Sequence, residues 1–587
     1  MNNKTNITEI SSEFKTHFDT LLNTPRTEPI NNTQSNLLLE DLLADLNGTE
    51  NDFTVNEEDV HKAINSLNKE KADDPFGIKA EHFVYAFDTP SSPNLTNLTR
   101  IINQIFQGNQ FPELLSTSHI VPIIKSYKKP INDPNNYRGI SLIPILTKLI
   151  EKIILLKCPQ LKHHDDNQFG FSSDGSTLHA EFLINETIRK YNSKHTPVYV
   201  CSLDAEKAFD SCNWHQLFVK LRSKGILPNS ILRFLIGLYQ HGDAKIKYQN
   251  TTSSAFLLSQ GVRQGSILSP YLYNIYTEDI LKEIRDLNIG TFLDPGINTS
   301  IIAFADDLIL LSPNLKHLQQ MLSLCESYGQ ATGLKFNSKK TQFVISGDCP
   351  FQHPTVIIND KEVKPQPTLK HLGFLWDTKL RKITLAGHQE NRISELWAVT
   401  FSLIASGIRK MHPNIIANIF RSIVLPKVLY GMELTVTSKP FLERLNRQCR
   451  SAFKNLLGYS KFGANDLNKL YKLADITPFI ENRKISLLAQ LMKNRQTSQY
   501  FLHILACRDR QYSIIPSIMQ ICARENINIV ELVLYFQKPF KVSNRGDLII
   551  DGMELDLVER LRTLIANWDV YDCRVEMRDI INRNIKT

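Results

Sequence analysis

The sequence lacks the features that mark a secreted or membrane-spanning chain. Its first residues, MNNKTNITEI, contain no apolar core of signal-peptide length. No stretch approaches the roughly 18 consecutive apolar residues of a membrane span. The nine cysteines include no C-x-x-C pair, which argues against a zinc knuckle or a disulfide framework. We therefore expect an intracellular protein in a reducing compartment.

Basic residues are scarce at one end of the chain. Residues 1–60 hold three Lys and Arg against twelve Asp and Glu, a balance of −9. The full 587 residues carry +8, so the remainder carries +17. A large basic body favours a polyanionic partner, because each neutralised phosphate releases a counterion. A surface tuned only for solubility explains the charge equally well.

Strand-like and helical segments alternate through the centre of the chain, and nearly everything after about residue 385 has a helical pattern. This order predicts an α+β core with helical ends. We expect residues 1–53 to be an acidic, loosely ordered arm with one short helix near LLLEDLLADL. The other predicted regions are a helical segment at 54–110, the α+β core at 111–380, and helical regions at 381–496 and 497–587.

Two adjacent aspartates, Asp306 and Asp307, lie inside the apolar run IIAFADDLILL. A buried carboxylate without a partner costs several kcal/mol, and two neighbours also repel each other. They sit where two apolar strands meet, which predicts the tip of a hairpin. Mg²⁺, a hard cation, is the counter-charge that suits such a pair. Asp204, at the end of the strand VYVCSL, is the candidate third acid of a two-metal site, with a helix N-cap as its alternative role.

The order of motifs resembles the reverse transcriptases of non-LTR (LINE-type) retrotransposons, from about residue 55 to at least residue 458. SLDAEKAFDSCNW, GVRQGSILSPYLYNIY and FADDLIL are similar to three palm motifs of that family. LKFNSKKTQFVI and LKHLGFLWD resemble the fourth and fifth, and NQFGFSSDGSTLHA resembles the family's QFGFRxGxST stretch. HIVPIIKSYKKPINDPNNYRGISLIP resembles the finger motifs. The resemblance implies a right-hand polymerase: fingers and a palm of antiparallel sheet on helices at 111–380, and a helical thumb at 381–496.

The resemblance also implies roles for single residues. Asp204, Asp306 and Asp307 would bind two Mg²⁺ ions, with Mn²⁺ as a substitute, and Lys340 would give a proton to the leaving pyrophosphate. The implied nucleotide-binding residues are Lys125, Arg138, Ala205, Phe209, Gln264 and Gly265. Core packing is the alternative for Phe209, and a solvated surface charge is the alternative for Lys125 and for Arg138.

Primer and template contacts are expected at two places. Leu372 and Gly373 resemble the turn that holds the primer end. In FLERLNRQCRSAFKNLLG, a basic face lies beside an apolar one, which suits contact with a duplex backbone; a merely solvated helix is the alternative. The basic face comprises Arg444, Arg447, Arg450 and Lys454.

The sequence departs from the family pattern in the fingers. Gly139 replaces the usual proline, Ser172 stands where arginine is common, and DDPFG replaces GPDG. We expect no endonuclease segment within the sequence, so a separate endonuclease is an implied partner.

The predicted function is an RNA-directed DNA polymerase that extends a DNA primer on an RNA template with dNTPs. Its expected RNA partner is that of its own element, in the nucleus or a cytoplasmic ribonucleoprotein and without a membrane. The alternatives are a group II intron-type or domesticated reverse transcriptase, and an inactive element remnant that binds RNA.

Overall fold

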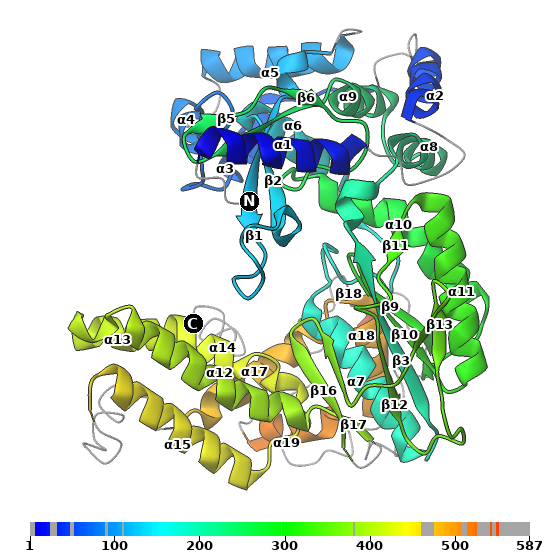
Figure 1. The fold of residues 1–587 in the computed structure, drawn as a ribbon, viewed down its shortest axis with the longest axis vertical. Helices are drawn as coiled ribbons and strands as arrows, with labels where there is room; N and C mark the ends of the chain where they lie inside the picture. Colours follow the sequence, from blue (N-terminus) through cyan, green and yellow to red (C-terminus); the bar gives the residue numbers. More distant parts are fainter. Residues whose placement is uncertain are drawn as a thin grey trace.

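The computed structural model is mixed α and β (Figure 1). It describes residues 6–23, 32–46, 52–87, 92–108, 111–294, 296–379, 382–459, 475–506, 513–524, 540–542 and 548–550. The fingers lie at the top of Figure 1, the palm sheet at the lower right and the thumb helices at the lower left. The predicted fold class is confirmed, with a sheet at the centre and helices at both ends.

The fingers are built on a sheet with strand order β2-β1-β4-β5, with β6 also paired to β4. Their strands are β1 (Ser118–Ile124), β2 (Tyr137–Leu142), β4 (Asp243–Tyr248), β5 (Thr251–Thr252) and β6 (Phe256–Leu257). Around them lie helices α2 (Asn32–Leu46), α3 (Glu57–Asn65), α4 (Ala80–Ala86), α5 (Pro93–Gln107), α6 (Ile145–Lys157), α8 (Trp214–Lys224) and α9 (Asn229–Gln240).

The segment predicted as a loosely ordered arm begins with a packed helix, α1 (Ile7–Asn23). Its Phe14 and Phe18 are buried against the fingers sheet, where the Phe14 ring meets Tyr137 edge-on at 4.8 Å between centroids. A side chain at residue 139 would come within 2.7 Å of the Phe18 ring, so Gly139 makes room for this helix. The expectation of disorder was wrong for residues 7–23, because a few aromatic anchors outweigh an acidic, polar composition.

The palm sheet has strand order β11-β3-β10-β9, with β12 on β3. Its strands are β3 (Val198–Glu206), β9 (Ile301–Phe304), β10 (Asp307–Ser312), β11 (Lys335–Phe336) and β12 (Gln342–Ser346). Alternate residues of β10 serve opposite faces: Leu308 and Leu310 join the core of α10 (Ser269–Asp286) and α11 (Leu315–Thr332), whereas Ile309 and Leu311 join that of α7 (Thr177–Ser193). Burial on both faces explains why these strands read as continuous apolar runs.

Small strand pairs border the palm: β7 (Phe292–Leu293), β8 (Ile297–Asn298), β13 (Val356–Ile358) and β14 (Lys361–Val363). The sheet β15 (Thr368–His371), β16 (Phe374–Lys379) and β17 (Lys382–Thr384) leads from the palm to the thumb. Its first hairpin carries the turn at residues 372–373 that was predicted to hold the primer end.

The thumb consists of α12 (Ala386–Ala405), α13 (Pro413–Ile419), α14 (Leu425–Leu429) and α15 (Lys439–Leu456). The segment Pro413–Leu434 is long and apolar enough to cross a membrane by length and composition alone. Half of it is buried, and Phe420, Val424 and Val428 pack in the same apolar cluster as Leu445 of α15. Packing within the thumb accounts for its apolar character.

The helices after the thumb pack on the palm. They are α17 (Thr477–Leu491), α18 (Arg495–Ala506) and α19 (Ile515–Arg524). The carboxylate of buried Glu186 on α7 accepts a hydrogen bond from the Tyr500 hydroxyl at 2.9 Å and one from the Ile514 amide at 3.0 Å. The predicted helical cover is confirmed up to Arg524. Beyond it the structure describes β18 (Phe540–Val542) and β19 (Leu548–Ile550), and the rest of that predicted region lies outside the described residues.

Candidate active site

Asp204 and Asp307 face each other across two neighbouring strands. They are directly opposed partners in the antiparallel pair β3–β10, so both side chains project from the same face of the sheet. Asp204 lies inside β3 and does not cap a helix, which removes the alternative role considered for it. Like charges that are directly opposed destabilise a sheet. This pair therefore needs a positive partner.

The turn before Asp307 is held by a glutamine from a distant motif. Gln168 is buried, and its Oε1 accepts hydrogen bonds from the Ala305 amide at 2.8 Å and the Gly170 amide at 2.9 Å. A side chain at residue 170 would come within 2.4 Å of the Ala305 nitrogen, so only glycine fits beside the turn. Ala305 itself has φ +56°, a left-handed conformation that costs free energy in a non-glycine residue. The tip of the β9–β10 hairpin is thus held by Gln168, a residue outside the hairpin.

The electrostatics of the site disfavour three ionised carboxylates. Burial raises the pKa of Asp306 to about 6, and the charges of Asp307 and Asp204 add to the effect. Burial also raises the pKa of Asp307; the charge of His371 opposes this rise and that of Asp204 reinforces it. A divalent cation is the species that would restore the ionised forms.

Lys340 supplies one positive charge at this site. Its Nζ lies 2.7 Å from Oδ2 of Asp204. A compact turn at residues 337–341 sets this position, since the Asn337 amide donates to the Asp204 carbonyl at 2.9 Å and the Lys340 amide donates to the Asn337 carbonyl at 3.0 Å. Both groups of the ion pair are partly exposed, so the pair can exchange partners when a ligand arrives.

The donor set fits a divalent metal that the substrate helps to bind. Among the residues that the structure describes, no three acidic, histidine or cysteine side chains are gathered as a ready-made metal site. Hard cations such as Mg²⁺ are commonly held by one or two carboxylates together with substrate phosphates. The opposed pair Asp204 and Asp307, with Asp306 beside it, supplies those carboxylates. The predicted convergence of all three on two metals stays a prediction.

The predicted nucleotide-binding residues fall into two groups, one in the palm and one in the fingers. In the palm, the Gln264 amide donates to Asp210 at 3.0 Å, and a side chain at Gly265 would come within 2.2 Å of the Ser141 carbonyl oxygen. In the fingers, the Lys125 Nζ donates to the Asn135 carbonyl at 2.9 Å. Burial lowers the pKa of Lys125, while the charge of Asp210 raises it. The fingers and the palm motif therefore meet beside the site.

Phe209 and Ala205 differ in their exposure to solvent. The Phe209 ring stacks on Tyr273 at 4.6 Å between centroids and remains only partly buried. Phe209 is thus packed against the core, and its predicted contact with a nucleotide sugar stays a prediction. Ala205 is buried and lies opposite Phe336 of β11. Arg138 is exposed on β2, directly opposite Ile123.

The predicted primer-end turn is strained and braced. Leu372 has φ +45° and Gly373 has φ +82°. The Tyr430 hydroxyl donates to the Leu372 carbonyl at 2.7 Å. The ring of Tyr430 also lies 3.2 Å from where a side chain at residue 373 would begin. This brace comes from the end of α14 in the thumb, 58 residues away, and was missed in the sequence.

A buried acidic residue, Glu181 of α7, was also missed. His371 donates from Nδ1 to the Glu181 Oε1 at 2.7 Å, and Trp376 donates from Nε1 to its Oε2 at 3.0 Å. Both partners lie in the hairpin that carries the primer-end turn. The ion pair is almost wholly enclosed, so it fixes that hairpin to the palm. The sequence signal is an acid, Glu181 in HAEF, on a helix whose second acid is also buried.

The basic face of α15 differs from its prediction. Arg447 is exposed, and Arg444 is ion-paired with Glu390 of α12. Lys454 is only 4% exposed, so it does not belong to a surface stripe. The helical pattern placed Lys454 beside the arginines, but the end of α15 is covered by its surroundings. Arg450 is partly buried.

Comparison with known proteins agrees with this geometry. A family model described as Reverse transcriptase (RNA-dependent DNA polymerase) matches residues 127–376. The RNA-directed DNA polymerase from mobile element jockey of Drosophila melanogaster is 24% identical over 363 residues, which cover 59% of this chain and 38% of the relative. The Retrovirus-related Pol polyprotein from the type-2 retrotransposable element R2DM of the same species is 27% identical over 305 residues. These cover 52% of this chain and 27% of the relative.

Among solved structures, telomerase from Candida albicans with a TWJ fragment of telomeric RNA has a TM-score of 0.37 and 12% identity over 69% of this chain and 66% of that one. The chain spans well under half the length of the two curated relatives. The matched residues include the carboxylate pair, the turn of Lys340 and the primer-end turn. Residues 127–376 therefore match the reverse transcriptase family, and the chain is similar there to the RNA-directed DNA polymerases of non-LTR retrotransposons.

Proposed function

We propose that this chain is an RNA-directed DNA polymerase that extends a DNA primer on an RNA template. The observation that carries the proposal is the directly opposed pair Asp204 and Asp307, with Asp306 in the adjoining turn, inside the matched domain. A sheet has no structural use for two opposed carboxylates, whereas phosphoryl transfer does.

Reverse transcriptases generally use divalent metal ions, and the proposed ions here are two Mg²⁺ with Mn²⁺ as a substitute. When bound, they would activate the primer hydroxyl and neutralise charge on the departing pyrophosphate. Asp204, Asp306 and Asp307 are the residues that would hold them. Lys340 carries a proton 2.7 Å from Asp204, where an ammonium can stabilise the leaving group and protonate it.

The neighbouring residues would position the nucleotide. Lys125 and Arg138 bring positive charge from the fingers to the triphosphate, Arg138 with a bidentate fork. Gln264 and Gly265 would pack against the nascent base pair, and Phe209 would exclude a ribose 2′-hydroxyl. The turn at Leu372 and Gly373 would hold the primer end, and α15 would contact the duplex through Arg447.

The proposed partners follow from this activity. They are dNTPs, an RNA template, a DNA primer end and the RNA of the chain's own element. A separate endonuclease would supply the nick. The proposed location is the nucleus or a cytoplasmic ribonucleoprotein.

Primer extension tests the proposal directly. Wild-type protein is incubated with poly(rA)/oligo(dT), dTTP and Mg²⁺ beside Asp306→Asn and the control Asp286→Asn, an exposed acid at the end of α10. We expect the control to match wild type and Asp306→Asn to lose at least about 100-fold in rate. Equal synthesis by all three would contradict the role assigned to the carboxylates. No synthesis by any, with RNA binding retained, would assign the chain to the inactive RNA-binding alternative.

A further inference from the structure

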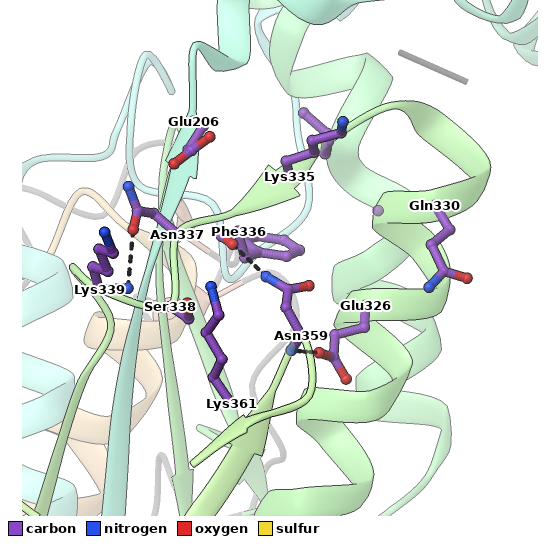
Figure 2. A pocket seen from close by; sticks show the side chains of 12 residues that line it. Glu206, Glu326, Gln330, Lys335, Phe336, Asn337, Ser338, Lys339, Asn359 and Lys361 are labelled. Atoms are coloured by element: carbon purple, nitrogen blue, oxygen red, sulfur yellow. Dashed lines mark hydrogen bonds between the residues drawn. The ribbon is translucent and has the colours of Figure 1, made fainter. Parts of the chain in front are cut away.

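A hollow lies on the palm, beside residues 337–339 of the turn that leads to Lys340. It is a cavity of about 760 Å³ between the β11 strand and its following turn, the C-terminal half of α11, and the β13–β14 hairpin (Figure 2). Residues 206, 326, 329, 330, 334–339, 359 and 361 line it. None of the residues assigned a role in the proposed function lines this cavity.

Three lysines stand around the cavity on separate elements. Lys335 belongs to β11, Lys339 to the following turn and Lys361 to β14, and Figure 2 shows them on different sides of the hollow. In the described part of the chain, none of their ammonium groups takes part in an ion pair or a side-chain hydrogen bond. Exposed lysines are usually solvated surface charges, but three that surround one hollow can act together on one anion.

Two glutamates also line the cavity, against three lysines. The carboxylate of Glu326 accepts a hydrogen bond from the Asn359 amide (Figure 2). Glu206 lies directly opposite Lys335 in the strand pair β3–β11. The lining therefore carries a surplus of positive charge. Amide and hydroxyl groups of Gln330, Asn337 and Ser338 supply neutral donors.

The lining favours a phosphate group over a nucleobase. Phe336 is the single aromatic residue among those lining the cavity, and it is only 5% exposed. A nucleobase would find no aromatic face on which to stack, which is the usual device for holding one. The lysines also stand on different sides of the cavity and do not form a row along which a strand could run (Figure 2). A small phosphate anion fits better than a nucleotide or a stretch of RNA.

One turn connects this cavity with the carboxylates. Residues 337–339 form part of its wall, and the next residue, Lys340, holds Asp204 at 2.7 Å. Glu206 on the cavity wall is two residues after Asp204 in β3. The cavity and the carboxylates are therefore neighbours in the fold, separated by this turn.

We propose that the cavity is a binding site for inorganic pyrophosphate, held by Lys335, Lys339 and Lys361 after its release from the catalytic carboxylates. This inference rests on the proposed function for the origin of the ligand. The binding itself depends only on the cavity. The site would draw the product away from the carboxylates and make their occupation by the next nucleotide less reversible.

Pyrophosphate binding without catalysis tests the proposal. Titration calorimetry is done on the full chain with sodium pyrophosphate, without nucleic acid and with EDTA present. The triple variant Lys335→Gln, Lys339→Gln and Lys361→Gln is compared with a charge-matched triple variant of other exposed lysines, Lys282→Gln, Lys316→Gln and Lys410→Gln. We expect affinity to fall at least about tenfold in the first and to stay within about twofold in the second.

Asp306→Asn separates this site from the catalytic one. With metal chelated, this variant should bind pyrophosphate as wild type does. If the cavity variant binds like wild type, or if both triple variants lose affinity equally, the proposal is overturned. Tighter binding of a short single-stranded RNA that displaces pyrophosphate would also overturn it, in favour of a nucleic-acid backbone. Lysine-dependent binding in a chain that fails primer extension would support the site and refute only the proposed origin of its ligand.

Discussion

Asp306 is the residue at which burial and like charge act together. Its pKa is raised to about 6 from an ordinary value of 3.8, chiefly by burial and then by Asp307 and Asp204. The folded protein therefore binds a proton there more tightly than the unfolded chain does. Between about pH 4 and pH 6, this group makes the folded state less stable as pH rises.

We therefore expect metal-free Asp306→Asn to be more stable than metal-free wild type at pH 7, by about 1 to 3 kcal/mol. The difference should shrink as pH falls from about 6 to 4, where the wild-type carboxyl becomes protonated. Urea denaturation in EDTA at a series of pH values measures it. A difference that is independent of pH, or that grows in acid, would contradict the assigned cause.

Glu181 offers a second prediction for a single residue. Because it accepts from both His371 and Trp376 in a dry environment, Glu181→Ala should cost about 3 to 5 kcal/mol of unfolding free energy. Glu181→Gln keeps a carbonyl acceptor and should cost less. Denaturant unfolding at pH 7 compares the two. Equal losses would mean that shape rather than hydrogen bonding is what Glu181 contributes.

The residues of the carboxylate site could be predicted from the sequence. The residues that hold the neighbouring turns in place could not. Asp204, Asp307 and Lys340 sit in recognisable local patterns, and the structure brings them together. Gln168 and Tyr430 act through contacts with residues 137 and 58 positions away. Gln168 lies in the recognised NQFGF stretch, but neither it nor Tyr430 shows in the sequence which distant residue it contacts. Lys454 shows the opposite error, since a helical pattern identifies a face but not what covers it.

Among the elements, α1 differs most from its prediction, because it is a helix packed on the fingers sheet. Its buried phenylalanines, four residues apart, close the fingers sheet, and Gly139 of β2 is open because Phe18 lies over it. Another departure from the family pattern is structural too: in DDPFG, the buried Asp74 accepts hydrogen bonds from the amides of Phe76 and Ile78 and from Ile145 at the start of α6. These departures are local repacking and do not indicate decay of the fingers.

We expect Phe14→Ala to destabilise the fingers by about 3 kcal/mol or more, because the ring is fully buried against Tyr137 and Tyr248. Hydrogen exchange should accelerate in α1 and the β1–β2 pair and stay unchanged in β3 and β10. Ile7→Ala is the control at an exposed position of the same helix, with an expected change within about 0.5 kcal/mol. Uniform acceleration through the palm would show that α1 is not confined to the fingers in its effect.

For the whole molecule, the helices after the thumb belong structurally with the palm. α17 and α19 share the apolar core of α7 and the palm strands, and Glu186 ties α18 to that core. The thumb is thus a set of helices bounded on both sides by segments fixed to the palm. The nucleic-acid contact proposed for α15 would lie on the exposed side of that helix.

Arg447 should therefore dominate the electrostatic contact of α15 with an RNA–DNA duplex. We expect Arg447→Gln to weaken duplex binding and to reduce the slope of log affinity against log salt by about 1. Lys454→Gln should leave the slope unchanged, because its side chain is buried. Fluorescence anisotropy across a salt series gives both slopes. A change of slope for Lys454→Gln as large as that for Arg447→Gln would support the basic face as it was first predicted.

The hydrogen bond from Tyr430 to Leu372 has a mechanical consequence. Gly431, directly after Tyr430, has φ +79° and lies so close to Phe374 and His388 that a larger residue could not replace it. Tyr430 and Gly431 lie between α14 and α15, so the hydrogen bond joins the thumb directly to the primer-end turn. A movement of the thumb at this point must either move that turn as well or break the hydrogen bond. The proposed duplex contact and the proposed primer alignment are therefore mechanically coupled.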